Sequence, residues 1–81
     1  MLSEYVPSSL GSRIRQLRLE MAISQEELAE RAWVHRTYLG GIERGERNPS
    51  LKNIVAIARA LKVTLPELFA FDHRPPTQPH D

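Results

Sequence analysis

The sequence of 81 residues contains no cysteine and no long hydrophobic run. The lack of cysteine excludes disulfides and thiolate metal sites, and it is typical of cytoplasmic proteins. The longest aliphatic run, residues 54–58, is far too short to cross a bilayer, and no secretory signal is visible. We therefore expect a cytoplasmic protein that has no membrane partner.

The sequence also lacks the residue patterns that catalysis and metal binding need. No serine or cysteine nucleophile is paired with a plausible base, and there is no glycine-rich phosphate loop. His35, His73 and His80 lack the helical i, i+4 spacing of a metal site. A chain of this length forms one domain with one core. Folding then buries roughly 60% of the surface that the unfolded chain exposes. We expect no enzyme activity, no cofactor, no metal and no small-molecule ligand.

The net charge of +1 hides an uneven distribution of charge along the chain. Residues 36–62 contain six basic and two acidic side chains, which gives this segment a charge of +4. A basic segment of this kind is typical of a surface that binds nucleic acid. The alternative is an ordinary solvated surface on which lysine and arginine are scattered.

Hydrophobic spacing and capping residues predict two helices in the first part of the chain. Hydrophobic side chains recur at helical spacing from Leu10 to Met21 and predict a helix over 9–21. Ser24 and Glu27 have the spacing of a capping box, in which each side chain bonds the backbone amide of the other residue. They predict that the second helix begins at Ser24.

Three further helices follow after a turn. The third is predicted over 36–43, with Gly45 ending it in a left-handed cap. Ser50 caps a fourth helix over 51–61, and a second capping box at 64–67 starts a short fifth helix. The side chains expected inside the domain are Ile14, Leu17, Leu28, Leu39, Ile42, Leu51, Ile54, Ile57, Leu61, Leu65 and Leu68.

The predicted fold class is therefore all-α, with one domain over residues 9–71. Residues 1–8 lack periodicity and are expected to form a flexible N-terminal arm. Residues 72–81 contain three prolines and no other apolar side chain, so we expect a disordered tail.

Residues 24–50 combine a capped helix, a turn at 33–35, a second helix and a basic exit loop, which is the arrangement of a helix-turn-helix. The segments SQEELAERA, TYLGGIERGERNPSL and IARALKV follow one another and closely resemble the phage lambda repressor-like (Cro-type) helix-turn-helix family. Within that family, HRTYLGGIERGERNPSL is most similar to the controller proteins of restriction-modification systems. The resemblance implies a five-helix DNA-binding domain whose second and third helices form the motif.

The resemblance further implies that the protein binds double-stranded operator DNA as a homodimer and regulates transcription. Arg36 would begin the recognition helix and form two hydrogen bonds with a guanine, and Gln25 would contact a phosphate. The other residues that the resemblance places at the DNA are His35, Thr37, Tyr38, Arg44, Arg47, Asn48 and Lys52. The alternatives are that the arginines are solvated surface charges and that Tyr38 covers the core.

Several positions depart from the family pattern. Ala22 and Trp33 stand where the family usually has glycine, and a left-handed backbone is strained at a large side chain. We therefore expect the turn geometry to differ there. We expect Trp33 to be partly buried, with an exposed partner contact as the alternative. Gly40 and Gly41 lie inside the third helix, where each costs about 1 kcal/mol relative to alanine. Gly41 removes one base contact unless the backbone approaches DNA closely.

Two further sets of residues have assigned roles. The resemblance implies a structural ion pair between Arg18 and Glu43 that bridges the first and third helices. Leu65, Phe69 and Phe71 supply more apolar surface than a small monomer covers, and they predict the dimer interface. An alternative function is an antitoxin-type module that binds a toxin protein. The sequence leaves open the operator, the half-site spacing, the genes controlled and the choice between activation and repression.

Overall fold

The computed structural model describes residues 9–71, and the arm and tail predicted at 1–8 and 72–81 lie outside the described residues. The described chain folds into five helices without a strand, which confirms the predicted all-α class. Each helix begins within one residue of its predicted start. The helices are α1 (Leu10–Glu20), α2 (Gln25–Ala32), α3 (Arg36–Glu43), α4 (Leu51–Ala60) and α5 (Leu65–Leu68).

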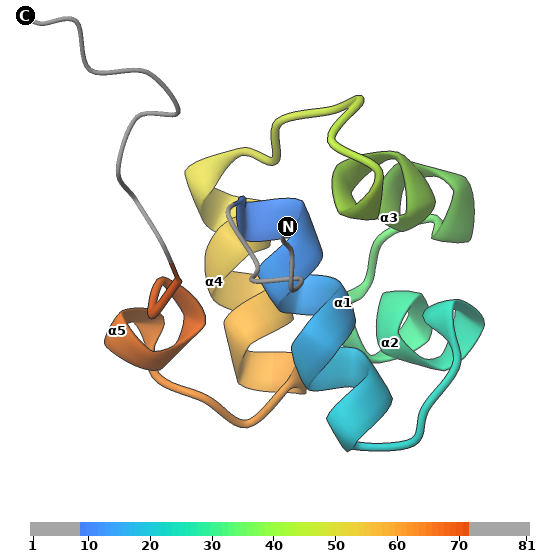
Figure 1. Ribbon diagram of the computed structural model, residues 1–81. Helices are drawn as coiled ribbons and strands as arrows, with labels where there is room; N and C mark the ends of the chain where they lie inside the picture. Colours follow the sequence, from blue (N-terminus) through green and yellow to red (C-terminus); the bar gives the residue numbers. More distant parts are fainter. Residues whose placement is uncertain (1–8, 72–81) are drawn as a thin grey trace, which may run out of the picture.

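The first helix lies at the centre of the domain (Figure 1). It packs against α3 and α5, which lie on opposite sides of it. The second helix packs against α3 and α4, and α4 also contacts α5. This arrangement places α3 and the loop after it at one end of the domain and α5 at the other end (Figure 1).

The helices enclose one hydrophobic core that matches most of the predicted positions. The predicted residues that are buried are Ile14, Leu17, Leu28, Leu39, Ile42, Ile57, Leu61 and Leu68. Ile54 is half-buried and packs against this cluster. The predictions for Leu51 and Leu65 are wrong, since their exposed fractions are 71% and 39%. Each is the first residue of its helix, ahead of the turn that reaches the core, and helical spacing alone does not reveal this.

Hydroxyl side chains cap four of the five helices. Each hydroxyl accepts a hydrogen bond from the amide three residues later, and the capping residues are Ser9, Ser24, Ser50 and Thr64. The box at Thr64 is complete, because its amide donates to the Glu67 carboxylate at 2.8 Å. The box predicted at Ser24 is only half formed. The Glu27 carboxylate instead accepts from Arg31 at 2.6 Å, because a charged guanidinium one helical turn away is a stronger partner than an amide.

Four helices end in a left-handed residue, although only one of these residues is glycine. The φ angles are 79° at Gly45, 59° at Ala22, 63° at Trp33 and 61° at Lys62. The expectation that Ala22 and Trp33 would alter the turn geometry is therefore wrong. A left-handed residue with a side chain costs about 1–2 kcal/mol, so other interactions must stabilise these turns.

The stabilising interactions come from the residue that follows each strained position. Its amide donates to the carbonyl five residues earlier, as in a Schellman motif: Ile23 to Arg18 at 3.3 Å, Val34 to Ala29 at 3.0 Å and Val63 to Ala58 at 3.0 Å. The side chains of Ile23, Val34 and Val63 also pack against the core. Burying these hydrophobic side chains fixes the direction of the chain after each helix.

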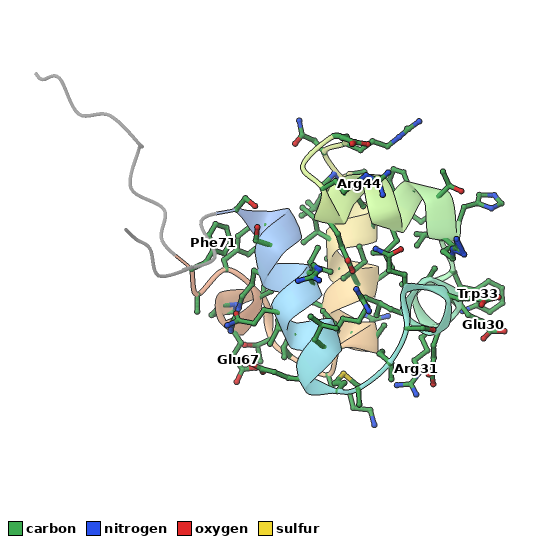
Figure 2. All side chains as sticks on the ribbon, turned by 45° about the vertical axis from the view of Figure 1, so that its right-hand side comes forward. Glu30, Arg31, Trp33, Arg44, Glu67 and Phe71 are labelled. Atoms are coloured by element: carbon green, nitrogen blue, oxygen red, sulfur yellow. The ribbon has the colours of Figure 1, made fainter. Side chains whose placement is uncertain are left out.

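The expectation that Trp33 is partly buried is wrong, because 94% of the residue is exposed. The left-handed turn carries its side chain to the edge of the domain, next to Glu30 (Figure 2). The indole ring therefore adds little to the core, whereas the Cβ of Trp33 causes the strain of the left-handed backbone.

Glycine allows two helices to touch at the α1–α3 crossing. Gly11 is buried, and a Cβ added there would overlap the carbonyl oxygen of Ile42. Gly40 is also buried, but its added Cβ would meet only side-chain atoms, with Arg44 Nη1 nearest at 3.1 Å. Side-chain tips can move and a helix backbone cannot, so the two glycines differ in consequence.

We predict that Gly11→Ala lowers the free energy of unfolding by about 3 kcal/mol or more, because the backbones of α1 and α3 must separate. The matched variant Gly40→Ala should raise it by about 0.5–1 kcal/mol, since alanine is the better helix former. Urea denaturation followed by circular dichroism measures both values. Similar effects of the two substitutions would contradict the close crossing at Gly11.

We predict that Trp33→Gly raises the free energy of unfolding by about 1 kcal/mol, because it removes the left-handed strain and loses little buried surface. Trp33→Ala is the control and should change stability little, because alanine keeps the Cβ. Thermal denaturation measures the difference. A loss of stability in both variants would mean that the indole packs against the fold.

Candidate nucleic-acid interface

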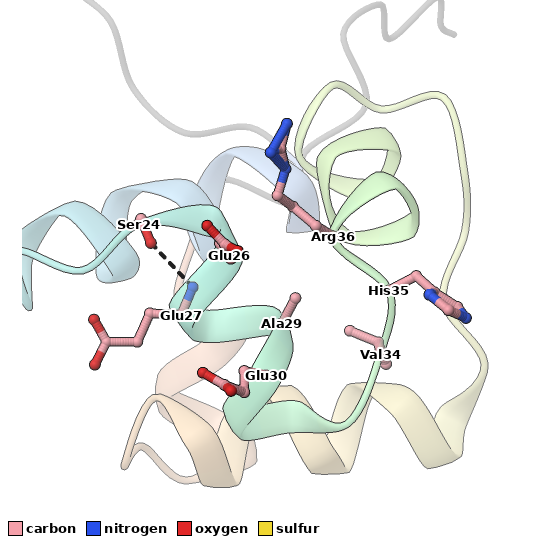
Figure 3. Close-up of a pocket in the computed structure, with 8 residues that line it drawn as sticks. All are labelled: Ser24, Glu26, Glu27, Ala29, Glu30, Val34, His35 and Arg36. Atoms are coloured by element: carbon pink, nitrogen blue, oxygen red, sulfur yellow. Dashed lines mark hydrogen bonds between the residues drawn. The ribbon is translucent and has the colours of Figure 1, made fainter.

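The third helix is exposed at its beginning and buried at its end. His35, Arg36 and Thr37 are exposed, and the residues from Leu39 to Glu43 are all buried. Arg36 projects away from the first turn, and His35 projects from the chain just before it (Figure 3). The second half of α3 thus anchors the helix, and the first turn extends its side chains into solvent.

Two hollows flank this first turn, and their charges differ. One, of about 530 Å³, lies between α2 and the start of α3 (Figure 3). Its wall carries the carboxylates of Glu26, Glu27 and Glu30. The other, of about 610 Å³, has no carboxylate and is lined by Trp33, Val34, His35, Thr37, Tyr38, Arg47, Ser50 and Asn53. Arg36 and His35 line the first hollow too, so one arginine faces three carboxylates there, whereas the second hollow has Arg47 without a carboxylate and suits a polyanion better.

Tyr38 is held in place within the second hollow. Its hydroxyl accepts a hydrogen bond from Asn53 Nδ2 at 3.1 Å. The Arg47 guanidinium lies 5.8 Å from the centre of its ring, within the range of a cation–π contact. The tyrosine hydroxyl retains its own hydrogen for an incoming acceptor. Asn53 is a site residue that the sequence did not reveal, because it lies 15 residues away on another helix.

Arg47 also covers the second of the two glycines in α3. A Cβ added at Gly41 would lie 3.2 Å from Arg47 Cγ, and the amides of Glu46 and Arg47 both donate to the Gly41 carbonyl. The glycine is therefore buried beneath this side chain. Its place on the surface of α3 is taken by an arginine from the following loop.

Three further predicted contact residues at or after the end of α3, namely Arg44, Asn48 and Lys52, are exposed. The guanidinium of Arg44 lies 3.1 Å from the Glu46 carboxylate. The hydrogen bond and then the charge of Arg44 lower the pKa of Glu46, and Glu46 raises the pKa of Arg44 by the same means. The exposed pair is screened by water, so another anion can compete for Arg44.

Behind α3 lies the ion pair that was predicted between α1 and α3. Arg18 Nε donates to Glu43 Oε2 at 2.7 Å, and Arg18 Nη2 donates to Oε1 at 3.0 Å. Only 9% and 1% of the two side chains are exposed. Gln25 joins this pair through a hydrogen bond from its Nε2 to Glu43 Oε1 at 2.9 Å.

The residues predicted for dimerisation lie apart from these groups, at α5. Leu65 is partly exposed, and Phe69 and Phe71 are half-buried with their ring centres 6.0 Å apart. Figure 1 shows α5 on the far side of α1 from α3. The structure therefore separates the predicted DNA-contact residues from the predicted dimer residues.

Within the described residues, no helix is long and apolar enough to span a membrane. The same part of the chain contains no group of three potential metal-ligating side chains.

The chain is similar to known regulators over most of its length. It matches the helix-turn-helix family over residues 14–68. Control protein C.BamHI of Bacillus amyloliquefaciens is 48% identical over 62 residues, which cover 75% of this chain and 76% of that protein. Control protein C.SmaI of Serratia marcescens is 42% identical over 59 residues, which cover 73% and 70%.

Solved structures show the same architecture. The restriction-modification controller protein C.AhdI from Aeromonas hydrophila has a TM-score of 0.72 and 48% identity, covering 74% of this chain and 91% of that chain. The P22 c2 repressor, solved in complex with a synthetic operator, has a TM-score of 0.71 and 29% identity, covering 76% and 94%. These similarities confirm the resemblance to lambda repressor-like proteins that the sequence indicated.

Proposed function

This chain belongs to the helix-turn-helix family of non-enzymatic DNA-binding transcriptional regulators, and we propose that it binds a pseudo-palindromic operator as a homodimer. The observation that carries the proposal is the projecting first turn of α3, whose second half is anchored in the core. A helix held in this way can enter the major groove and present its first side chains to base edges.

The roles of the residues follow from where they lie. Arg36, at the tip, would form two hydrogen bonds with guanine, and His35 and Thr37 lie beside it at the groove. The carboxylate-free hollow would receive one backbone strand, with Tyr38 and Arg47 at its phosphates. The other proposed backbone contacts are Gln25, Arg44, Asn48 and Lys52.

The proposed dimer uses the surface of α5. Leu65, Phe69 and Phe71 bring apolar area to the side of the domain opposite α3. A two-fold axis at this surface would leave both copies of α3 free to face DNA. Two such helices contact half-sites one turn apart, about 34–36 Å, on one face of the duplex.

The relatives named control and controller proteins support a more specific role, the autoregulatory control of a restriction-modification system. Dimerisation and operator occupancy both depend on protein concentration, so such a regulator responds to its own accumulation. The protein would act in the cytoplasm, because a regulator must share a compartment with its DNA.

Selection of bound duplexes from a random DNA pool tests the function. We expect enrichment of two inverted half-sites whose centres lie one helical turn apart. Enrichment of single half-sites would overturn the dimer arrangement, and the absence of any enriched sequence would overturn specific binding.

We predict that Arg36→Ala weakens binding to the selected operator by about 1–3 kcal/mol and relaxes the preference at one base pair. Arg47→Ala is the matched comparison: it should weaken binding to all sequences alike and reduce the salt dependence by about one unit of slope. Binding isotherms at several salt concentrations measure both effects. Equal weakening of operator and random DNA by Arg36→Ala would assign Arg36 to the backbone.

We predict that the protein sediments as a dimer at tens of micromolar, and that Leu65→Ser with Phe69→Ser shifts it toward monomer. Removing apolar side chains from the proposed interface takes away the burial that drives association. Sedimentation velocity without DNA measures the state. Dimers that persist in the variant would place the interface elsewhere on the domain.

A further inference from the structure

Three helices meet at the carboxylate of Glu43, at the end of α3. Arg18, from α1, donates two hydrogen bonds to this carboxylate and a third, through Nη1, to the carbonyl of Ile23 at 2.9 Å. Gln25, the first residue of α2, donates the remaining bond at 2.9 Å. The cluster therefore connects the buried interior to the side chain that begins α2.

The chemistry of the carboxylate determines the orientation of the Gln25 amide. An ionised carboxylate only accepts hydrogen bonds, so the NH₂ group of Gln25 must face Glu43, and its carbonyl oxygen must face elsewhere. One N–H of the amide is then used by Glu43. The second N–H points in a fixed direction, because the two N–H bonds of a planar amide diverge at a set angle.

Gln25 is half-buried, and its amide lies beside Gly40 and Glu43 in the buried second half of α3. A Cβ added at Gly40 would lie 3.5 Å from Gln25 Oε1 and 3.1 Å from Arg44 Nη1. The glycine thus leaves room for the amide and the guanidinium on one side of α3. Phosphate oxygens only accept hydrogen bonds, so the side chain of Gln25 can bind a phosphate only through its second N–H.

The charge of the cluster also suits this position. A lone carboxylate beside the DNA backbone would repel it, but Arg18 neutralises Glu43 at 2.7 Å. The pair therefore offers Gln25 a strong acceptor without adding net negative charge to the surface.

We propose that Glu43, neutralised by Arg18, is a positioning residue for DNA binding that holds the Gln25 amide with one N–H directed at a backbone phosphate. This inference rests on the proposed function, since it assigns a source of affinity to the same interface. It extends the role of the ion pair beyond joining α1 to α3. Without the pair, the amide can flip and the long side chain regains rotamer freedom, which it must lose again on binding.

The test replaces the pair without leaving a buried charge. Arg18→Met with Glu43→Leu removes both charges together, and such replacements are often neutral for stability. We expect a melting curve close to that of the parent protein and an affinity for the selected operator that is about threefold to tenfold weaker, the effect of one unrestrained side chain. The control is Arg15→Ala with Glu20→Ala, which removes one exposed charge of each sign from α1 and should leave affinity unchanged.

Replacing the Arg18–Glu43 pair in a protein that carries Gln25→Ala separates a positioning effect from a general structural effect. Gln25→Ala should itself weaken operator binding, and in that background the replacement of the pair should have no further effect. An equal loss in both backgrounds, or no loss in the parent background, would overturn the inference. If Gln25→Ala binds like the parent while Arg36→Ala does not, the inference fails and the proposed function stands. If the parent binds no duplex, both fail.

A measurement on the unmodified protein tests the inference even if the variant that replaces the pair does not fold. The side-chain NH₂ of Gln25 should have an NMR order parameter near that of rigid backbone, about 0.85, before DNA is added. A value below about 0.6, as in flexible segments, would overturn the inference.

Discussion

The close contact between α1 and the end of α3 is the constraint on which the rest of the structure depends. Gly11 lets the backbone of α1 reach the carbonyl of Ile42, and the Arg18–Glu43 pair ties the same two helices together. A helix of eight residues does not persist alone in water, so α3 exists because its second half is buried. Anchoring one end is also what leaves the other end free to project.

The charges on either side of that projecting turn determine how DNA can lie against it. The carboxylates of α2 line one hollow, and the other contains Arg47 with the amide of Asn53 and the hydroxyls of Tyr38 and Ser50. A net charge of +1 conceals this division. The electrostatic signal for nucleic acid is therefore local, and it arises because α3, the following loop and the start of α4 converge.

The helix ends show why glycine alone does not mark the left-handed turns. Glycine marks the left-handed turn at Gly45, but Ala22, Trp33 and Lys62 adopt the same geometry without it. What these three turns share is a hydrophobic residue directly afterwards, which packs against the core. The partial burial of Ile23, Val34 and Val63 and the backbone hydrogen bond that each donates together offset a strain of about 1–2 kcal/mol at the preceding residue.

The sequence by itself determined the number, order and limits of the helices, because hydrophobic spacing and hydroxyl caps act over a few residues. It also marked the basic segment and, through its resemblance to known regulators, the residues of α3. Only the tertiary structure decided that Leu51 and Trp33 are exposed and that Arg47 lies over Gly41. It also decided that Asn53 binds Tyr38 and that Glu43 binds Gln25. These outcomes depend on which helices meet, and contacts between residues 15 to 25 positions apart leave no periodic trace in the chain.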